Sequence, residues 1–408
     1  MTFTKLTIRD VPLEGKTVLV RADYNVPLNK DGTIRDDLRV RASIPTIEYL
    51  LKNRCKVVIV SHLGRPTTAK EPEFSLEPVA IRLAELLDQP VSFVENCYGD
   101  AVKQAVKKAT LGSVTLLQNV RYYAEEEAND ELFAKKIVQS VGAKLFVQDG
   151  FGVVHRAHAT TDAITHYAPS VAGLLLEREY KTITDAMENP KRPLVAVMGG
   201  AKVSDKIGVI EQFVGKADTI LVGGAMANTF LDYKGLEMGA SMVESGQQDI
   251  IHSLYEAATA KRPTNVDEFI VLPQDVAMGV NVTEGDRREV VMSNRVGASE
   301  RVLDIGDKTI EQFVKIVEKA GTVIWNGTLG YAELPEFAHG SARLALALAT
   351  NPGVTSIIGG GDTADFVNHW AGDNEAPFTH VSTGGGASLE LMAGNILPGV
   401  SCLLDAPR

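Results

Sequence analysis

Short, β-branched apolar runs alternate with longer segments of helical pattern along almost the whole of this 408-residue chain. Near-continuous apolar strands that alternate with helices are typical of parallel sheets whose two faces are both covered. The expected strands lie in KTVLVRADYNVP, KVVIVSHLGRP, SVTLLQNVRYY and AKLFVQDGF in the first half, and in PLVAVMGG, TILVGGAM, FIVLPQDVA, TVIWNGTLG, VTSIIGGGD and THVSTGGG in the second. The pattern predicts an α/β protein made of two doubly wound, Rossmann-like parallel-sheet domains.

The predicted domain boundary is the long helical stretch VAGLLLEREYKTITDAMENPKRP. Pro190 and Pro193 end this helix before the next strand, because proline cannot continue an α-helix. We therefore expect a first domain over residues 1–185, a second over 190–394, and a joining helix over about 171–189. Two domains joined in this way can hinge.

Charge and composition restrict the possible partners. A formal net charge of -11 disfavours a nucleic-acid partner, so a site for an acidic substrate must be a local concentration of cations. No run approaches the roughly 18 apolar residues of a membrane span, and the N-terminus carries no apolar signal segment, so we expect a cytoplasmic protein with no membrane partner. The three scattered cysteines suggest neither a disulfide framework nor a zinc site.

The residues that follow the strands of the first half are cationic and polar. Ligands of open parallel sheets bind beyond the carboxyl ends of the strands, so these positions are candidate ligand contacts. Any single arginine among them more often forms a solvated or structural ion pair than a ligand contact. Arginines at several equivalent positions favour a ligand with carboxylate or phosphate groups, bound bidentately. The candidates are Arg21, Asp23, Asn25, His62, Arg65, Arg121, His155 and Arg156.

Glycines follow the strands of the second half instead. They lie at 199–200, 223–224, 359–361 and 384–386, which suggests a backbone surface that a nucleotide and its phosphates can approach closely. Lys202 and Lys206 would share one face of a helix if that segment is helical. Asp362, beside Thr363, is either a ligand of a nucleotide-borne Mg²⁺ or a helix N-cap. Neither the P-loop spacing nor GxGxxG is present.

A cationic pocket in one half and a glycine-lined site in the other suit phosphoryl transfer across a closing cleft. The chain has no HRD-type catalytic loop. A carboxylate acceptor needs no general base because it is already ionised at neutral pH. What remains is to neutralise charge and to align the reacting groups.

At this point the motifs resemble those of bacterial-type phosphoglycerate kinases, in order and over essentially the whole chain. The matching segments are VRADYNVPL, SHLGRP, LLQNVRYYAEEE, FGVVHRAHAT, GGAKVSDK, GGAMANTFL, WNGTLGYAE, GGGDTADF and STGGGASLELMAG. The resemblance implies a 3-phosphoglycerate site in the first domain, a Mg-nucleotide site in the second, and a segment over 395–408 that returns to the first. It also implies a monomer that transfers a phosphoryl group between 1,3-bisphosphoglycerate and ADP, giving 3-phosphoglycerate and ATP, with domain closure.

The resemblance also assigns residues to roles. The implied catalytic residues are Arg39, Lys202, Gly385 and Gly386. The implied substrate-binding residues are Asp23, Asn25, Arg39, His62, Gly64, Arg65, Arg121 and Arg156. The implied nucleotide-binding residues are Lys202, Lys206, Gly223, Gly224, Gly327, Glu333, Gly360, Gly361, Asp362 and Thr363, with Asp362 reaching the metal through Mg-ATP or Mg-ADP. Only the resemblance points to Arg39. This residue begins RVRASIPTIEYLL, which has the pattern of a helix start, so it is not among the residues selected because they follow a strand.

Three segments depart from the usual family pattern. SERVLDIG has Val302 in place of a glycine, and WNGTLGYAE has Thr328 and Ala332 in place of a proline and an aromatic residue. These changes concern the base and ribose wall, which leaves the nucleotide preference open. QDGFGVVHR replaces the commoner NDAFGTAHR but keeps the arginine.

Three other interpretations compete with this one. A dehydrogenase would share the fold, but no GxGxxG follows a first strand. An idle nucleotide-binding scaffold would lose charged site residues, whereas this chain keeps both lysines, Asp362 and the arginines. His155 and His158 could form a metal pair, but the resemblance favours a loop beside the substrate phosphate.

Overall fold

The computed structural model describes residues 3–67, 71–372 and 377–407 of the chain. The chain divides into two compact units. The N-terminal unit comprises Thr2–Lys181 together with Ile396–Arg408, and the C-terminal unit comprises Thr182–Asn395. The division falls within helix α6 (Leu174–Glu188), so one helix contributes residues to both units.

The N-terminal unit is built on a parallel sheet with the strand order β3-β4-β2-β1-β5-β6. Alternate residues of its strands pack on opposite faces: Val57 and Ile59 of β2 join one apolar cluster, and Val58 and Val60 join the other. Both faces are therefore buried, as the near-continuous apolar runs predict. The strands are β1 (Thr17–Arg21), β2 (Lys56–Val60), β3 (Val91–Val94), β4 (Val114–Leu117), β5 (Leu145–Gln148) and β6 (Ser170–Ala172).

Helices α1 and α2 supply buried apolar residues to the first of these clusters, and α3 and α5 supply them to the second. The N-terminus of α5 is capped by Asp130, whose side chain accepts from the backbone N–H of Phe133. The helices of this unit, apart from the part of α6 that it contains, are α1 (Leu38–Lys52), α2 (Glu77–Leu87), α3 (Asp100–Lys108), α4 (Ala124–Glu127), α5 (Glu131–Val141) and α15 (Pro398–Ser401). Short 3₁₀ turns lie at η1 (Pro72–Phe74), η2 (Val120–Tyr122), η3 (Phe151–Val153) and η4 (Ala163–His166).

The C-terminal unit contains a second parallel sheet, with the strand order β15-β14-β13-β7-β8-β9. Trp325 of β13 is fully buried and lies in the main apolar cluster with residues of α11, α12 and α13. The strands are β7 (Leu194–Met198), β8 (Thr219–Val222), β9 (Ile270–Val271), β13 (Thr322–Asn326), β14 (Thr355–Gly359) and β15 (His380–Val381). The helices are α7 (Ile207–Lys216), α8 (Gly224–Tyr233), α9 (Gln248–Lys261), α10 (Val266–Phe269), α11 (Asp307–Val317), α12 (His339–Ala349), α13 (Gly361–Ala371) and α14 (Gly386–Met392), with 3₁₀ turns η5 (Ser204–Lys206), η6 (Ser293–Arg295) and η7 (Pro335–Phe337).

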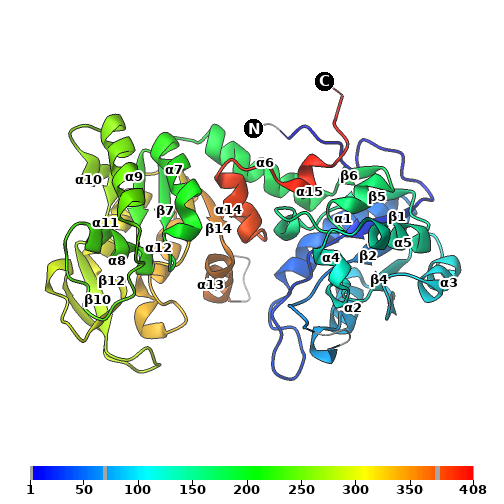
Figure 1. Ribbon diagram of the computed structural model, residues 1–408, viewed down its shortest axis with the longest axis horizontal. Coiled ribbons are helices and arrows are strands. Elements are labelled where there is room, and N and C mark those ends of the chain that lie inside the picture. The colour runs from blue at the N-terminus through cyan, green and yellow to red at the C-terminus, as the bar shows by residue number, and fades with distance from the viewer. Residues whose placement is uncertain (1–2, 68–70, 373–376, 408) are drawn as a thin grey trace. The chain divides into compact units, whose positions relative to one another are not determined.

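The prediction of two α/β parallel sheets is confirmed, but the C-terminal unit also has an antiparallel sheet that the apolar pattern does not reveal. Its order is β11-β10-β12, with β10 (Asp275–Gly279), β11 (Glu289–Met292) and β12 (Arg301–Ile305). The run FIVLPQDVA, expected to be one strand, is divided between β9 and β10 at Pro273. Proline has no N–H for a ladder bond, which explains the break. Helix α8 lies beside β12 (Figure 1), and its Leu231 joins Val276 and Met278 of β10 in one apolar cluster.

The helix expected over about 171–189 begins later than predicted. Val171 and Ala172 belong to β6, which pairs with β5, and α6 begins at Leu174 after Gly173. Two side chains from elsewhere satisfy the first N–H groups of α6. Thr46 Oγ1 accepts from Leu174 N at 2.9 Å, and Asp149 Oδ1 accepts from Leu175 N at 2.9 Å.

The C-terminal segment is hydrogen-bonded within the N-terminal unit. Leu404 N donates to Ser170 O at 3.0 Å, and Leu6 N donates to Leu404 O at 2.8 Å. Gly399 N donates to Val154 O at 2.9 Å, and Lys5 Nζ donates to the carbonyl oxygen of Ser401 at 2.8 Å. Figure 1 shows the segment, in red at α15, beside β6. No helix in the described part of the chain is both long enough and apolar enough to span a bilayer.

Candidate active site

The predicted substrate residues lie at the carboxyl ends of neighbouring strands of the N-terminal unit. The strands β4, β2, β1 and β5 are consecutive in the sheet. Arg121 follows β4, His62 follows β2, Asp23 follows β1 and Arg156 follows β5. Parallel strands end at the same edge of a sheet, so residues far apart in the sequence come together there. The sheet order thus brings together the residues that the strand-end argument selects.

Hydrogen bonds join the loops that carry these residues. Asp23 Oδ2 accepts from Arg39 Nη1 at 2.8 Å, which ties the loop after β1 to the first turn of α1. Asn25 Oδ1 accepts from Gly64 N at 2.8 Å, and Gly64 O accepts from Arg121 Nη1 at 2.6 Å. The loops after β1, β2 and β4 therefore hold one another in place.

Gly64 has a conformational reason to be glycine. Its φ is +59°, and a Cβ at this position would approach Phe74 to 2.3 Å. A side chain here would be strained and would collide with the ring of Phe74. Gly64 therefore serves the site through its backbone, whose N–H and C=O meet Asn25 and Arg121.

His62 is buried among cationic groups. Burial lowers its pKa well below the ordinary histidine value, and the charges of Arg21, Arg121 and Arg39 act in the same direction. Burial also lowers the pKa of His158 to about 4. Both rings are therefore neutral at physiological pH, and the arginines supply the positive charge of the site.

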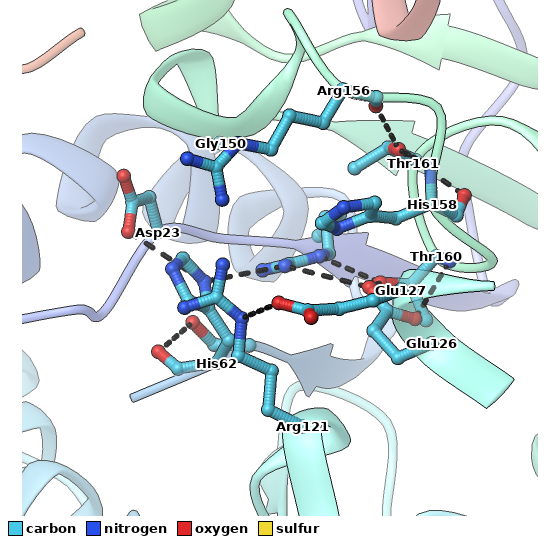
Figure 2. Close-up of polar contacts among 12 residues, drawn as sticks. Asp23, His62, Arg121, Glu126, Glu127, Gly150, Arg156, His158, Thr160 and Thr161 are labelled. Atoms are coloured by element: carbon cyan, nitrogen blue, oxygen red, sulfur yellow. Dashed lines mark hydrogen bonds and ion pairs between the residues drawn. The ribbon is translucent and has the colours of Figure 1, made fainter. Parts of the chain in front are cut away.

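The remaining arginines differ in exposure. Arg121 is mostly buried, and its Nε lies 3.2 Å from Glu127 Oε1, a contact drawn as a dashed line in Figure 2. Burial lowers the pKa of Arg121, and Arg156 and Arg65 are among the cations that add to this effect. Arg156 is partly exposed, and Arg65 is exposed. The charges of Arg121, Arg156 and Arg65 therefore repel one another, and a polyanion bound among them would relieve this repulsion.

Arg21 is not a ligand-facing residue, contrary to the strand-end argument. Its side chain is 1% exposed, and its Nε donates to Thr160 Oγ1 at 2.8 Å. Its Nη2 lies 3.8 Å from Glu126 Oε1, and Glu126 is fully buried. Sequence reasoning also missed the structural roles of Glu126 and Thr160. AEEE reads as a charged surface, and no local pattern shows that its second glutamate points inward.

Glycine turns follow β7, β8, β13 and β14 in the C-terminal unit, where they pack tightly against one another. Gly200 N donates to Thr328 O at 2.9 Å, and Gly224 N donates to Leu329 O at 2.8 Å. Gly327 has a φ of +96°, and a Cβ there would lie 2.3 Å from the carbonyl carbon of Gly199. At these positions the glycines allow backbone segments to come closer than any side chain would permit.

Lys202 and Lys206 have different environments and do not form a pair on one helix face. Residues 204–206 form the 3₁₀ turn η5, Lys202 is exposed, and Lys206 is buried. Lys206 Nζ donates to Gly199 O at 2.8 Å and to Asn326 O at 3.0 Å. Burial lowers the pKa of Lys206 to about 8, while the Asp362 and Asp205 carboxylates raise it. A phosphate bound nearby would favour the charged amine.

Asp362 and Thr363 lie in the first turn of α13. The N-cap position is Gly360, so the N-cap interpretation of Asp362 is wrong, and its carboxylate is exposed. Thr363 is buried, and its Oγ1 accepts from Gly327 N at 2.7 Å. Helix α14 begins at Gly386, with Gly385 as its N-cap at a φ of +51°. Glu333 is exposed in the turn after β13.

Comparison with known proteins decides the family. The family model described as phosphoglycerate kinase matches residues 8–395. The chain belongs to the phosphoglycerate kinase family.

Curated relatives and solved structures agree with this family. The phosphoglycerate kinase of Dictyoglomus turgidum is 44% identical over 402 residues, covering 98% of this chain and 99% of its own. That of Chloroflexus aggregans is 46% identical over 406 residues, with the same coverage. The structure of the enzyme from Coxiella burnetii matches with a TM-score of 0.82 at 35% identity, covering 98% of each chain. That from Pyrococcus horikoshii OT3 matches with a TM-score of 0.84 at 31% identity and equal coverage.

Two of the three segments that depart from the usual phosphoglycerate kinase pattern lie in the C-terminal unit. Val302, on β12, is mostly buried and packs with Leu231 and Met278 in a small apolar cluster. Thr328 contributes its carbonyl oxygen to the turn after β7, a role that does not depend on its side chain. The contacts of Lys206 and Thr363 involve none of the altered side chains.

The chain offers no preformed metal site within its described residues. No cluster there of three or more His, Cys, Asp or Glu side chains could hold a metal ion. Mg²⁺ commonly binds through one or two carboxylates together with substrate phosphates and water. A single exposed carboxylate at Asp362 fits a metal that arrives with the nucleotide.

Proposed function

We propose that the N-terminal unit binds 3-phosphoglycerate or 1,3-bisphosphoglycerate through Asp23, Asn25, Arg39, His62, Gly64, Arg65, Arg121 and Arg156. The observation that carries this assignment is that Arg121, from the loop after β4, and Arg39, from α1, lie near neutral His62 at the carboxyl end of β2. A small acid that bears both a carboxylate and a phosphate suits such a site. Guanidinium forks bind both groups bidentately, and the net charge of -11 of the whole chain disfavours non-specific anion binding.

The proposal places Mg-ATP or Mg-ADP on the C-terminal unit. Lys202, Lys206, Gly223, Gly224, Gly327, Glu333, Gly360, Gly361, Asp362 and Thr363 would contact the nucleotide. The support is the set of tightly packed glycine turns, with the buried amine of Lys206 among them. The N–H groups of Gly200, Gly224 and Gly327 already donate within the protein, so these glycines serve by keeping the backbone free of side chains. The N-terminus of α13, which begins at Gly361, is where backbone N–H groups would meet a phosphate. When bound, Mg²⁺ supplies charge neutralisation on the nucleotide phosphates, and Asp362 would hold it.

In this proposal the chain catalyses transfer through charge stabilisation. Arg39 and Lys202 would meet the charge that develops on the transferring phosphoryl group, assisted by the backbone at Gly385 and Gly386. The acceptor carboxylate is ionised at neutral pH, so no side chain has to remove a proton. The implied closure, which would bring the two ligands together, stays a prediction.

A coupled assay tests the reaction directly. The purified chain with 3-phosphoglycerate, ATP and Mg²⁺ should produce 1,3-bisphosphoglycerate, detected by its reductive dephosphorylation with an NADH-linked enzyme. Omission of either substrate should abolish the signal. If the folded chain binds ATP but yields no acyl phosphate, the idle-scaffold alternative holds and the proposed reaction is wrong.

Substitutions in the substrate-binding set and in the nucleotide-binding set should each weaken one ligand only. Arg65→Ala or Arg156→Ala should weaken 3-phosphoglycerate by about 10-fold or more, because a charge-assisted contact is lost, and should barely alter ATP affinity. Asp362→Ala should weaken Mg-ATP alone. Isothermal titration with each ligand separately measures both effects.

Matched controls are available in the same two units. Arg41 on α1 is an exposed arginine paired with Asp37, and Asp365 on α13 lies one turn beyond Asp362. Arg41→Ala and Asp365→Ala should leave both affinities unchanged. Equal losses of both ligands in any one of the site variants would contradict the assignment.

A further inference from the structure

The orientation of the His62 ring determines which of its nitrogens can carry a proton. His62 Nδ1 lies 3.3 Å from Arg21 Nη2, within hydrogen-bond reach. A guanidinium group has only N–H donors, so a nitrogen that bonds to it must offer a lone pair. In the neutral ring the proton is then on Nε2.

Asp23 is the competing partner for the same ring nitrogen. Its Oδ1 lies 3.9 Å from His62 Nδ1, which is beyond hydrogen-bond distance. Both oxygens of Asp23 already accept from other donors, namely Arg39 Nη1 at 2.8 Å and Asn25 N at 3.1 Å. Asp23 therefore gives little reason for a proton on Nδ1, and the bond from Arg21 decides the tautomer.

Arg21 is itself held from several sides. Its Nε donates to Thr160 Oγ1 at 2.8 Å, and its Nη1 donates to the carbonyl oxygen of Ala22. The hydroxyl of Thr160 donates in turn to Glu126 Oε1 at 2.5 Å, and Thr160 N donates to Glu126 Oε2 at 3.0 Å. These side chains are at most 1% exposed, and Figure 2 shows Glu126 and Thr160 next to each other. The guanidinium plane is thereby fixed relative to the ring of His62.

We propose that Arg21, held by Glu126 and Thr160, fixes His62 as the neutral tautomer with its proton on Nε2, so that His62 serves the acid substrate as an uncharged hydrogen-bond donor. This rests on the proposed function, which places His62 in the 3-phosphoglycerate site. Arg21, Glu126 and Thr160 are then positioning residues, because they act through His62.

The charges around the ring favour this state. The ionisable groups that face His62 are Arg21 of β1, Asp23 after it, Arg39 of α1, Arg121 of η2 and His158 of the loop after η3. The cations among them outnumber the single carboxylate, and that carboxylate is paired with Arg39. A second positive charge on the ring would be repelled, whereas a neutral N–H donor still orients a carboxylate or phosphate oxygen.

Nitrogen-15 NMR of histidine-labelled, ligand-free protein tests the tautomer independently of any substrate. The signals of His62 are assigned by their loss in His62→Gln. We expect Nδ1 to show the shift of an unprotonated acceptor and Nε2 that of an N–H, with no titration between about pH 8 and pH 5.5. A proton on Nδ1, or an imidazolium at neutral pH, would overturn the proposal.

A conservative variant tests the role of Arg21. Arg21→Lys keeps the charge beside Glu126 but cannot reach Thr160 and His62 at once. We expect His62 to exchange between its two tautomers and the 3-phosphoglycerate dissociation constant to rise roughly 5- to 10-fold, with ATP affinity unchanged. Arg9→Lys, at an ion pair with Glu177 on the surface of the same unit, is the control and should change neither.

These experiments distinguish a failure of the tautomer inference from a failure of the proposed function. If Arg21→Lys leaves the Nε2–H tautomer fixed, Arg21 does not set it and the inference is wrong. If His62→Gln leaves 3-phosphoglycerate affinity unchanged, the placement of His62 in the substrate site fails, and with it the role of its N–H. Should Arg21→Lys fail to fold, the wild-type spectrum still decides the tautomer.

Discussion

Arg39→Ala and Lys202→Ala should each lower turnover by about 10²-fold or more, because each removes a charge needed where negative charge gathers in the transition state. Lys202 is exposed, so Lys202→Ala should change the free energy of unfolding by no more than roughly 0.5 kcal/mol. Arg39 is about a quarter exposed and is paired with buried Asp23, so Arg39→Ala should cost about 1–3 kcal/mol and still leave the protein folded. The coupled assay measures turnover, and urea denaturation measures stability.

Exposed cations of the same units serve as controls for this pair. Arg41→Ala on α1 and Lys315→Ala on α11 remove a surface charge of the same kind and should retain turnover. If Arg39→Ala or Lys202→Ala folds normally and keeps near-normal turnover, that residue has no catalytic role. If a control variant loses turnover equally, the loss comes from removing any positive charge from the protein and not from a specific contact of Arg39 or Lys202.

Gly327→Ala should destabilise the C-terminal unit by about 3–5 kcal/mol, because it combines backbone strain with overlap in a packed site. The φ of Gly327 is +96°, and the added methyl group would lie 2.4 Å from Lys206 Nζ as well as against the backbone of Gly199. The two lysine bonds to the turns should break, and nucleotide affinity should fall with them. Urea unfolding and titration with ATP measure the two losses.

Gly215→Ala is the matched control for this glycine. Gly215 lies in α7 of the same unit and needs no positive φ, and a methyl group added to it would meet no atom outside its own helix within 4 Å. Alanine is the better helix former there, so stability should stay equal or rise by up to about 1 kcal/mol. Equal unfolding midpoints for the two variants would show that the turn at Gly327 tolerates a side chain.

The sequence predicts the parallel sheets well because their strands are short apolar runs with both faces buried. It fails at FIVLPQDVA, where an apolar run continues through Pro273 into a strand of a different sheet. Strand pairing depends on contacts that are distant in sequence, so periodicity cannot distinguish a parallel strand from an antiparallel one when both are buried.

For the candidate site, too, the sequence predicts position in the fold better than it predicts the role of each side chain. Strand-end positions select Asp23, His62, Arg121 and Arg156, but they cannot show that Arg21 points inward to Glu126, 105 positions later (126 minus 21). Nor could spacing alone separate exposed Lys202 from buried Lys206. Whether a charged side chain binds a ligand or supports its neighbours depends on burial, which is decided by the tertiary structure.

The pairing of the C-terminal segment with Leu6 and Ser170 has a consequence for biosynthesis. A ribosome makes the whole of Thr182–Asn395 between the two portions of the N-terminal unit. Domains tend to fold as units during synthesis, N-terminal first, at about 5–20 residues per second. The C-terminal unit can therefore be complete before its neighbour, whose last hydrogen bonds, including that from Gly399 to Val154, must wait until residues 396–408 have been made.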